Sequence, residues 1–228
     1  MPTHLKVIPT NDSSKTIYNA KLKETYHSIN GAVTESIHVY INAGLKYFYN
    51  KNNGNKIKIL EIGLGTGLNV ILSVQKIMQL KNTLIHFTSL EPFPLSQNII
   101  KQLNYLSFIK KKLIPIFDKI HSSSFENNIE LLENFIFKKI KKKIEDFSTK
   151  EKYDIIFFDA FAPNKQPEIW KIENLKKLYK LMKSKSILLT YCASGQFKRT
   201  LKEIGFDVEV LEGPPGKKEI VRASKYKK

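Results

Sequence analysis

The stretch that decides the fold is Lys56-Ile-Lys-Ile-Leu-Glu-Ile-Gly-Leu-Gly-Thr-Gly-Leu-Asn-Val-Ile-Leu72. It starts with an apolar run typical of a buried strand, residues 57–62, and it ends with the apolar spacing of a helix. Between the two stand Gly63, Gly65 and Gly67, which allow a tight turn and a close approach of the backbone to a ligand. Strand, glycine turn and helix form the opening unit of a nucleotide-binding α/β domain.

The pattern of this turn separates two classes of nucleotide ligand. A dinucleotide fingerprint, G-x-G-x-x-G, would place its third glycine at the position of Leu68. The pattern here is instead E-x-G-x-G-x-G, with Glu61 near the end of the strand. A carboxylate there suits a cation and repels a pyrophosphate, so S-adenosylmethionine, which has a sulfonium, an amine and no phosphate, fits better than NAD. A glycine turn without any ligand is the alternative that the motif alone leaves open.

Composition limits the classes of protein to which the chain belongs. Its 228 residues and 42% hydrophobic content suit one large domain, or a core with an N-terminal extension. No apolar run is long enough to span a bilayer, and the N-terminus lacks the pattern of a signal peptide. The single cysteine, Cys192, excludes an internal disulfide framework and a cysteine-based metal site. These features favour a cytoplasmic enzyme without a metal centre.

The formal net charge of +17 permits a nucleic-acid partner. A surface of this sign attracts a polyanion such as RNA and speeds its encounter. However, nearly all of the positive charge is lysine, and the chain is also rich in isoleucine and asparagine. The codons for lysine, isoleucine and asparagine are rich in A and T, so an AT-biased genome would favour these residues at surface positions that tolerate substitution. The charge by itself therefore argues only weakly for an RNA partner.

Residues 1–50 are predicted to be an N-terminal extension or cap, and residues 51–228 the α/β domain. Within the cap, residues 5–8 and 15–18 read as two short strands around a polar turn. Residues 33–49 have one apolar face and are predicted to form a helix that leads into the core.

The segment between residues 95 and 150 has a less regular pattern. Residues 95–109 are predicted to be helical, and the third strand of the domain is expected at residues 134–137. The lysine-rich run at residues 138–143 is interpreted as the solvated face of a helix rather than as a binding patch, and its spacing leaves open whether it lies on the active-site side, where it could contact phosphates.

Two further strands end in carboxylates. The strand at residues 84–90 is followed by Glu91, which lies 24 residues beyond Gly67. An acidic residue at about this distance bonds the ribose hydroxyls in nucleotide-binding folds, although a solvated loop glutamate is the alternative. The apolar strand at residues 153–158 stops at Asp159. Because ligands of open α/β sheets bind at the carboxyl ends of strands, both side chains are candidate site residues.

The remaining elements complete a recognisable architecture. Residues 208–211 and 219–223 are predicted to be strands that are joined by the loop Gly213-Pro-Pro-Gly-Lys-Lys218. A closing antiparallel hairpin on an otherwise parallel sheet is the arrangement of class I S-adenosylmethionine-dependent methyltransferases. We therefore predict a Rossmann-like α/β fold with a seven-stranded sheet of this class and an N-terminal cap.

Blocks of sequence throughout the chain resemble the methyltransferase part of the bacterial tRNA 5-methylaminomethyl-2-thiouridine biosynthesis enzyme, in a standalone form. The matching blocks are Tyr26-His-Ser28, Glu35-Ser-Ile-His-Val39, Glu61-Ile-Gly-Leu-Gly-Thr-Gly-Leu-Asn69, Glu91-Pro-Phe-Pro94, Phe158-Asp-Ala-Phe-Ala-Pro163, Gln166-Pro-Glu-Ile-Trp170, Thr190-Tyr-Cys-Ala-Ser-Gly195 and Gly213-Pro-Pro-Gly216. The glycine motif occurs in many methyltransferases, whereas the Asp-Ala-Phe-Ala-Pro and Gly-Pro-Pro-Gly-Lys blocks are much more specific.

The resemblance implies S-adenosylmethionine as the methyl donor and the tRNA anticodon stem-loop as the partner. The implied reaction is N-methylation of 5-aminomethyl-2-thiouridine at the wobble position. Larger members of the family carry a second, FAD-dependent oxidase domain, which this sequence does not contain. A separate FAD-dependent oxidase is therefore a possible partner that acts upstream, and neither FAD nor a metal is expected here.

The resemblance also implies roles for individual residues. Asp159 would accept hydrogen bonds from the substrate amine, while Phe161 and Tyr191 would offer aromatic faces to a cation. Other side chains fall into two groups. The expected cofactor contacts are Tyr26, Glu61, Gly63, Gly65, Thr66, Gly67, Asn69 and Glu91. The expected RNA phosphate contacts are Arg199, Lys217, Lys218 and Arg222.

One departure from the family pattern concerns the adenine. Many class I methyltransferases carry an acidic residue after the third strand, whereas residues 137–140 here are Phe-Lys-Lys-Ile. Two other functions stay open at this point. One is methylation of another amine, on a protein or a small molecule, and the other is a basic RNA-binding module on a degenerate fold. Intact Glu61, Glu91 and Asp159 argue against the binding module.

Overall fold

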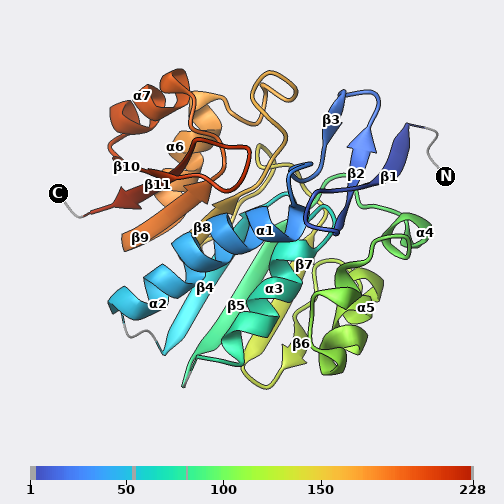
Figure 1. The fold of residues 1–228 in the computed structure, drawn as a ribbon. Coiled ribbons are helices and arrows are strands. Elements are labelled where there is room, and N and C mark those ends of the chain that lie inside the picture. The colour runs from blue at the N-terminus through green and yellow to red at the C-terminus, as the bar shows by residue number, and fades with distance from the viewer. Residues whose placement is uncertain (1–3, 53–54, 81, 227–228) are drawn as a thin grey trace.

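A computed structural model describes residues 4–52, 55–80 and 82–226. A large sheet runs through its centre, helices cover both faces, and a small second sheet lies at one end (Figure 1). The strands of the large sheet are β4 (Lys56–Ile62), β5 (Leu84–Leu90), β6 (Ile129–Leu132), β7 (Phe135–Ile140), β8 (Tyr153–Phe158), β9 (Met182–Thr190), β10 (Asp207–Glu212) and β11 (Glu219–Lys225).

The order of these strands confirms the predicted class of fold. It is β10-β11-β9-β8-β4-β5-β7-β6, in which β9, β8, β4, β5 and β7 are parallel, and β11 and β10 form the closing antiparallel hairpin. The predicted count of seven strands is wrong by one. Strand β6 adds an eighth at the edge, where it pairs antiparallel with β7.

The additional strand comes from a hairpin whose second strand, β7, runs into the lysine-rich segment. Two apolar segments, β6 and β7, are separated by the two residues Glu133 and Asn134, a spacing typical of a β-hairpin. The expected third strand at residues 134–137 therefore extends to Ile140, and the run that begins at Lys138 is not a helix face. Lys139 is buried, and its Nζ donates to the carbonyl oxygens of Ile120 and His121.

The helices form two layers. A continuous helical stretch and its neighbours cover one face of the sheet, and α6 and α7 cover the other (Figure 1). The helices are α1 (Ala32–Ser36), the π-helix η1 (Ile37–Lys46), α2 (Tyr47–Asn52), α3 (Leu68–Ile77), α4 (Gln97–Ile100), the 3-10 turns η2 (Tyr105–Ser107) and η3 (Lys111–Leu113), α5 (Ile114–Ser122), α6 (Ile172–Leu181) and α7 (Gly195–Ile204). In the described ranges, none of them is long and apolar enough to cross a membrane.

Alternation along the strands divides the core between these two layers. In β4, Ile57 and Ile59 face the layer that contains η1 and α3, whereas Leu60 and Ile62 face the layer that contains α6 and α7. Because both faces are covered, the parallel strands read as nearly continuous apolar runs. The helix predicted at residues 95–109 is instead short, since only α4 and the turn η2 form there.

The N-terminal cap contains the second sheet, made of β1 (Leu5–Pro9), β2 (Lys15–Asn19) and β3 (Glu24–Thr25). The two strands predicted here are present, and the predicted helix appears as the stretch α1-η1-α2. This stretch packs its buried residues into the core of the large sheet. The expected limit of the cap at residue 50 falls within α2, and a division of the chain there remains a prediction.

Asp12 joins the turn of the cap to the start of α1. Its Oδ2 accepts hydrogen bonds from the backbone N and the Oγ1 of Thr34, at 2.8 and 2.9 Å. Gly31, immediately before the helix, has φ +142°, and an added Cβ would lie 2.8 Å from Asp12 Oδ2. A side chain at residue 31 would therefore displace the carboxylate that fixes the first turn of α1.

We expect the Asp12→Ala variant to lose stability in a pH-dependent manner. Partial burial tends to raise the pKa of Asp12, but hydrogen bonds from Ser14, Thr34 and Thr10 outweigh it and lower the pKa to about 2. Because this value lies below the unfolded value of 3.8, the stabilisation is present above about pH 4 and is lost as the pH falls toward 2. Urea unfolding should show a loss of about 1 kcal/mol at pH 7, after allowance for solvent screening, which shrinks below pH 4. A pH-independent difference would contradict this account.

Candidate active site

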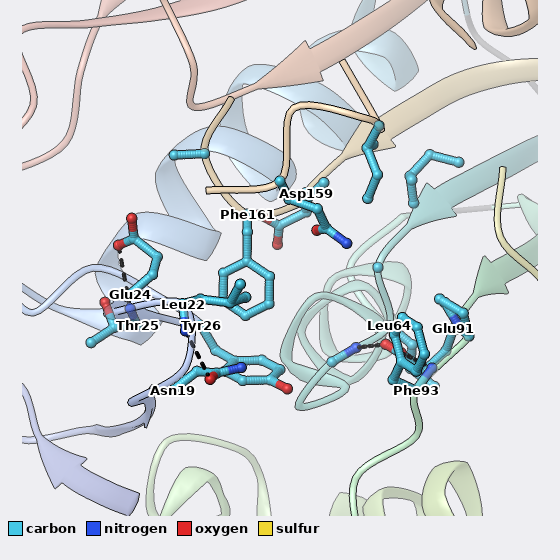
Figure 2. A pocket seen from close by; sticks show the side chains of 18 of the residues that line it. Asn19, Leu22, Glu24, Thr25, Tyr26, Leu64, Glu91, Phe93, Asp159 and Phe161 are labelled. Atoms are coloured by element: carbon cyan, nitrogen blue, oxygen red, sulfur yellow. Dashed lines mark hydrogen bonds between the residues drawn. The ribbon is translucent and has the colours of Figure 1, made fainter. Parts of the chain in front are cut away.

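A cavity of about 1250 Å³ opens at the carboxyl ends of the parallel strands. The loop after β4, Glu91 after β5 and Asp159 after β8 line it, together with residues 18, 19 and 21–29 of the cap. Figure 2 shows Tyr26 and Phe161 on one side of this space and Leu64, Glu91 and Phe93 on the other. The strand ends that the sequence singled out therefore meet at one cavity, as expected for an open α/β sheet.

The glycine loop has a backbone that other residues could not adopt without strain. Gly63, Gly65 and Gly67 have φ values of +94°, +49° and +71°, all in the left-handed region. A Cβ added at Gly63 would lie 2.6 Å from the carbonyl oxygen of Asp159, and one added at Gly65 would lie 3.2 Å from the ring of Tyr26. The loop is thus a bare cradle of backbone, against which a ligand can pack closely.

Glu91 fixes the shape of this cradle. Its Oε2 accepts a hydrogen bond from Gly65 N, and its Oε1 accepts one from Phe93 N, both at 2.8 Å. Burial raises the pKa of Glu91, and these two bonds oppose the rise. Each carboxylate oxygen keeps a second lone pair, so Glu91 can still accept from hydroxyl groups in the cavity.

Glu61 lies behind the cavity, and among the described residues the wall does not include it. Its side chain is fully buried, its Oε2 accepts from Ser89 Oγ at 2.5 Å, and its Oε1 accepts from Asn69 Nδ2 at 3.1 Å. Burial raises the pKa of Glu61 well above its ordinary value. The direct contact with the methionine end of a cofactor that the sequence led us to expect is therefore replaced by a role in the support of other residues.

Asp159 is the carboxylate that faces the cavity. Its Oδ1 accepts from the hydroxyl of Tyr40, and its Oδ2 accepts from Asn69 Nδ2, both at 2.8 Å. Burial is the main cause of its raised pKa, and the negative charge of Glu35 adds to the effect, so that the pKa is about 7. A carboxylate with this pKa can take up and release a proton near neutral pH.

Two histidines contact Thr66 of the glycine loop, and one of them, His27, lines the cavity. The Oγ1 of Thr66 lies 2.6 Å from His27 Nε2, and the carbonyl oxygen of Thr66 lies 3.2 Å from His121 Nε2. Burial lowers the pKa of both histidines to about 4, so both are neutral at pH 7. Thr66, which the resemblance placed among the cofactor contacts, is fully buried and acts on the loop.

The structure adds a further carboxylate, Glu35 on α1, which is not among the site residues expected from the sequence. It lines the cavity, its Oε2 accepts from Ser28 N at 2.8 Å, and its Oε1 pairs with Lys217 Nζ at 2.6 Å. The Nζ of Lys217 lies 3.7 Å from the centre of the Tyr191 ring. Since the two partners come from opposite ends of the chain, only the helical block that contains Glu35 could have drawn attention to it.

The expected RNA contacts do not gather in one place. In the described part of the chain, Lys217 lines the cavity and Arg199, Lys218 and Arg222 do not. Arg222 is 6% exposed, and its guanidinium donates to Glu209 and to the carbonyl oxygen of Ala43. Arg222 is therefore engaged within the fold, whereas Lys218 is exposed and the exposed Arg199 donates to Gln196 Oε1.

The arrangement suits a cationic nucleoside. Ligand pockets usually measure roughly 300–1,000 Å³, so this cavity has room for a donor and for part of a second molecule. Carboxylates of Glu35, Glu91 and Asp159 and aromatic rings of Tyr26 and Phe161 face the space. In the described ranges, no group of three or more histidine, cysteine, aspartate or glutamate residues is placed to hold a metal ion.

Comparison with known proteins agrees with this geometry. Residues 102–226 match the model of a family described as S-adenosyl-L-methionine-dependent methyltransferase. The tRNA 5-methylaminomethyl-2-thiouridine biosynthesis bifunctional protein MnmC of Campylobacter fetus is 26% identical over 91% of this chain and 34% of that protein. The protein of the same name from Leptospira interrogans is 31% identical over 88% of this chain and 32% of that protein.

A solved structure shows the same fold. The crystal structure of MnmC2 from Aquifex aeolicus matches with a TM-score of 0.79 and 21% identity, covering 98% of this chain and 70% of that chain. The chain spans about a third of the length of the curated relatives that it matches. The resemblance inferred from the sequence blocks is confirmed, and the chain belongs to the S-adenosyl-L-methionine-dependent methyltransferase family.

Proposed function

We propose that the protein transfers a methyl group from S-adenosylmethionine to the primary amine of 5-aminomethyl-2-thiouridine at the wobble position of tRNA. The observation that carries this proposal is Asp159, a carboxylate with a pKa of about 7 that faces the cavity beside the glycine loop. An alkylammonium cannot attack a methyl carbon, so an amine-methylating enzyme needs a group that accepts a proton near neutral pH. The tRNA substrate is taken from the relatives, which are named for biosynthesis of 5-methylaminomethyl-2-thiouridine in tRNA.

The donor would lie along the glycine loop, with the methyl group on its sulfonium supplying the electrophile. Glu91 would accept hydrogen bonds from the ribose hydroxyls, because its carboxylate stands at the end of β5 and lines the cavity. Tyr26 and the backbone of Gly63 and Gly65 would pack against the donor, while Glu61 and Asn69 would act through Asp159. Gly67 would contribute indirectly, because its left-handed backbone helps to set the position of Thr66 in the loop.

Asp159 would act as the general base of the reaction. Its carboxylate takes a proton from the substrate ammonium, which leaves a neutral amine whose lone pair then attacks the methyl carbon in line with the leaving sulfur. Tyr40 and Asn69 hold both oxygens of Asp159, so the carboxylate has one fixed orientation toward the amine. Alignment of the two reactants in this way can supply much of the rate.

Aromatic and basic groups would hold the rest of the substrate. The ring of Phe161 packs edge-on against Tyr26 at a centroid distance of 4.9 Å, which gives the cavity an aromatic wall for a base or a cation. Lys218 and Arg199 are exposed, and they would meet backbone phosphates of the anticodon stem-loop. A separate FAD-dependent oxidase would prepare the aminomethyl precursor, and the cytoplasm is the compartment in which tRNA is modified.

Nucleoside analysis of tRNA tests the proposal. tRNA that carries 5-aminomethyl-2-thiouridine is incubated with S-adenosylmethionine, with and without the protein, and its nucleosides are separated by mass. We expect the precursor to gain one methyl group only when the protein is present. The alternative substrate classes would be favoured if the precursor stayed unchanged while the protein, given a cell extract and the same donor, methylated a protein or a small amine.

Replacing Tyr40 by Phe should shift the pH dependence of this reaction. The hydroxyl of Tyr40 donates to Asp159 and lowers its pKa, so its loss should raise the pKa further above 7. Because activity requires the ionised carboxylate, the acid limb of the kcat/KM profile should move to higher pH by about one unit. Tyr179→Phe, which removes a hydroxyl bonded to Gly205 instead, is the control. A profile for Tyr40→Phe that matches both wild type and control would contradict the role of Tyr40.

A further inference from the structure

The side chain of Lys217 lies between Glu35 and Tyr191, and we call the space between these two residues the enclosure. The ammonium of Lys217 lies 2.6 Å from Glu35 Oε1 and 3.7 Å above the centre of the Tyr191 ring. A carboxylate and an aromatic face are the two groups that together recognise an alkylammonium ion. The side chain of Glu35 is only 7% exposed, so the carboxylate depends on a cation at this place.

The backbone of Lys217 lies outside this enclosure, and only its side chain reaches in. Lys217 belongs to the loop between β10 and β11, where its backbone N donates to Pro214 O at 2.9 Å. The tip of the loop contacts the cap, since a Cβ added at Gly216 would lie 1.9 Å from Asn30 Nδ2. The lysine side chain keeps 27% exposure, so its four-carbon stem can turn toward solvent while the loop stays in place.

The enclosure borders the group that receives the proton. The hydroxyl of Tyr191 donates to Ala160 O at 2.7 Å, in the residue that follows Asp159. Glu35, Tyr191, Lys217 and Asp159 all line the same cavity. The charges of Glu35 and Lys217 act on Asp159 in opposite directions, as expected for groups that are near it.

We propose that Glu35 and Tyr191 form an alkylammonium-binding site that Lys217 fills in the free protein and that the ammonium of the substrate fills before methylation. Exchange of one ammonium for another keeps the buried carboxylate of Glu35 paired throughout. The substrate nitrogen would thus arrive beside Asp159 as an ammonium ion. Asp159 would then take one proton from this ammonium and leave a neutral amine. The released Lys217 is free to pair with a phosphate. The identity of the occupant rests on the proposed function, whereas the existence of the site does not.

The site can be tested without any methylation assay. In Lys217→Ala the enclosure loses its internal cation, and n-butylammonium, which copies the lysine side chain, should fill it. We expect the melting temperature of this variant to rise saturably, by roughly 3–6 °C at a tenfold excess over Kd. Wild type should show no more than the effect of an equal concentration of sodium chloride. Lys218→Ala is the matched control, because Lys218 is the exposed neighbour outside the cavity wall.

The double variant Glu35→Gln/Lys217→Ala separates a specific site from general binding. It lacks the carboxylate, so the stabilisation by n-butylammonium should disappear, and n-butanol should not stabilise either variant. Equal shifts in Lys217→Ala, Lys218→Ala and wild type, or a shift that survives in the double variant, would overturn the site. If Lys217→Ala is recovered folded only in the presence of the amine, that dependence supports the site. A variant that the amine does not rescue counts against it.

A second measurement tests the occupant. n-Butylammonium should inhibit tRNA methylation by Lys217→Ala competitively with tRNA, and it should leave the KM for S-adenosylmethionine unchanged. Inhibition that is competitive with the methyl donor, or no inhibition at concentrations that stabilise the variant, would show that the substrate amine does not use this site. Failure of the proposed function would appear differently, as a lack of methylation by wild type while the melting-temperature shifts of the variant persist.

Discussion

Asp159→Asn is expected to lower kcat for methyl transfer by about 10²–10⁴-fold while the affinity for S-adenosylmethionine changes by only a few-fold. The amide has nearly the shape of the carboxylate, but it cannot accept the proton that the substrate ammonium must lose. Its oxygen can still accept from Asn69 Nδ2 while its NH₂ donates to the hydroxyl of Tyr40, so the orientation of the side chain is kept. The loss should therefore fall on the chemical step, since Glu91 and the glycine loop still hold the donor.

Single-turnover methylation and calorimetry measure the two parts of this prediction separately. Asp118→Asn, at an exposed position in α5, is the control for the substitution itself. Raising the pH should restore activity in part, because free amine then forms without a base. A variant that turns over at the wild-type rate at pH 7 would remove Asp159 from the mechanism.

Gly63→Ala is expected to have the largest effect on cofactor binding. The position has φ +94°, which costs an alanine roughly 1–3 kcal/mol, and the added Cβ would lie 2.6 Å from the carbonyl oxygen of Asp159. Backbone atoms cannot move aside as a side chain can, so the cradle and the start of the Asp159 loop must shift together. We expect the Kd for S-adenosylmethionine to rise by about 10–100-fold, with a parallel loss of kcat.

Gly195→Ala is the matched control for this change. Gly195 begins α7, its φ is outside the left-handed region, and the nearest atom to an added Cβ is the mobile Arg199 Nη1 at 3.4 Å. That variant should bind the donor as wild type does, and it should be equally stable or slightly more stable. If calorimetry gave Gly63→Ala the affinity of Gly195→Ala, the glycine loop would not be the cofactor cradle.

The parts of the fold that the sequence predicted are those in which a local pattern and the tertiary structure agree. The strand before Gly63, the helix after it and the closing hairpin are all present, because apolar periodicity and glycine positions act over a few residues. Strand β6 and the end of β7 were missed. At the end of β7 the lysine-rich composition resembles a solvated helix, and the tertiary packing of Lys139 under α5 shows that alternate residues of a strand face inward.

The site shows the same division. Glu91 and Asp159 could be found because parallel strands must end at one edge of the sheet. Sequence could not show that Glu61 and Asn69 lie behind Asp159, since residue type does not reveal which face of the loop a side chain takes. Nor could it pair Glu35 with Lys217 or Arg222 with Glu209, because those contacts depend on how distant elements pack.

A crystal structure with sinefungin, a donor analogue that carries an amine in place of the transferred methyl group, tests the central claim most directly. We expect the analogue to lie along the glycine loop with this amine directed at Asp159 and about 4–6 Å from its carboxylate, which leaves the space that the substrate nitrogen needs. An analogue bound with its amine directed away from Asp159, or bound outside the cavity, would contradict it.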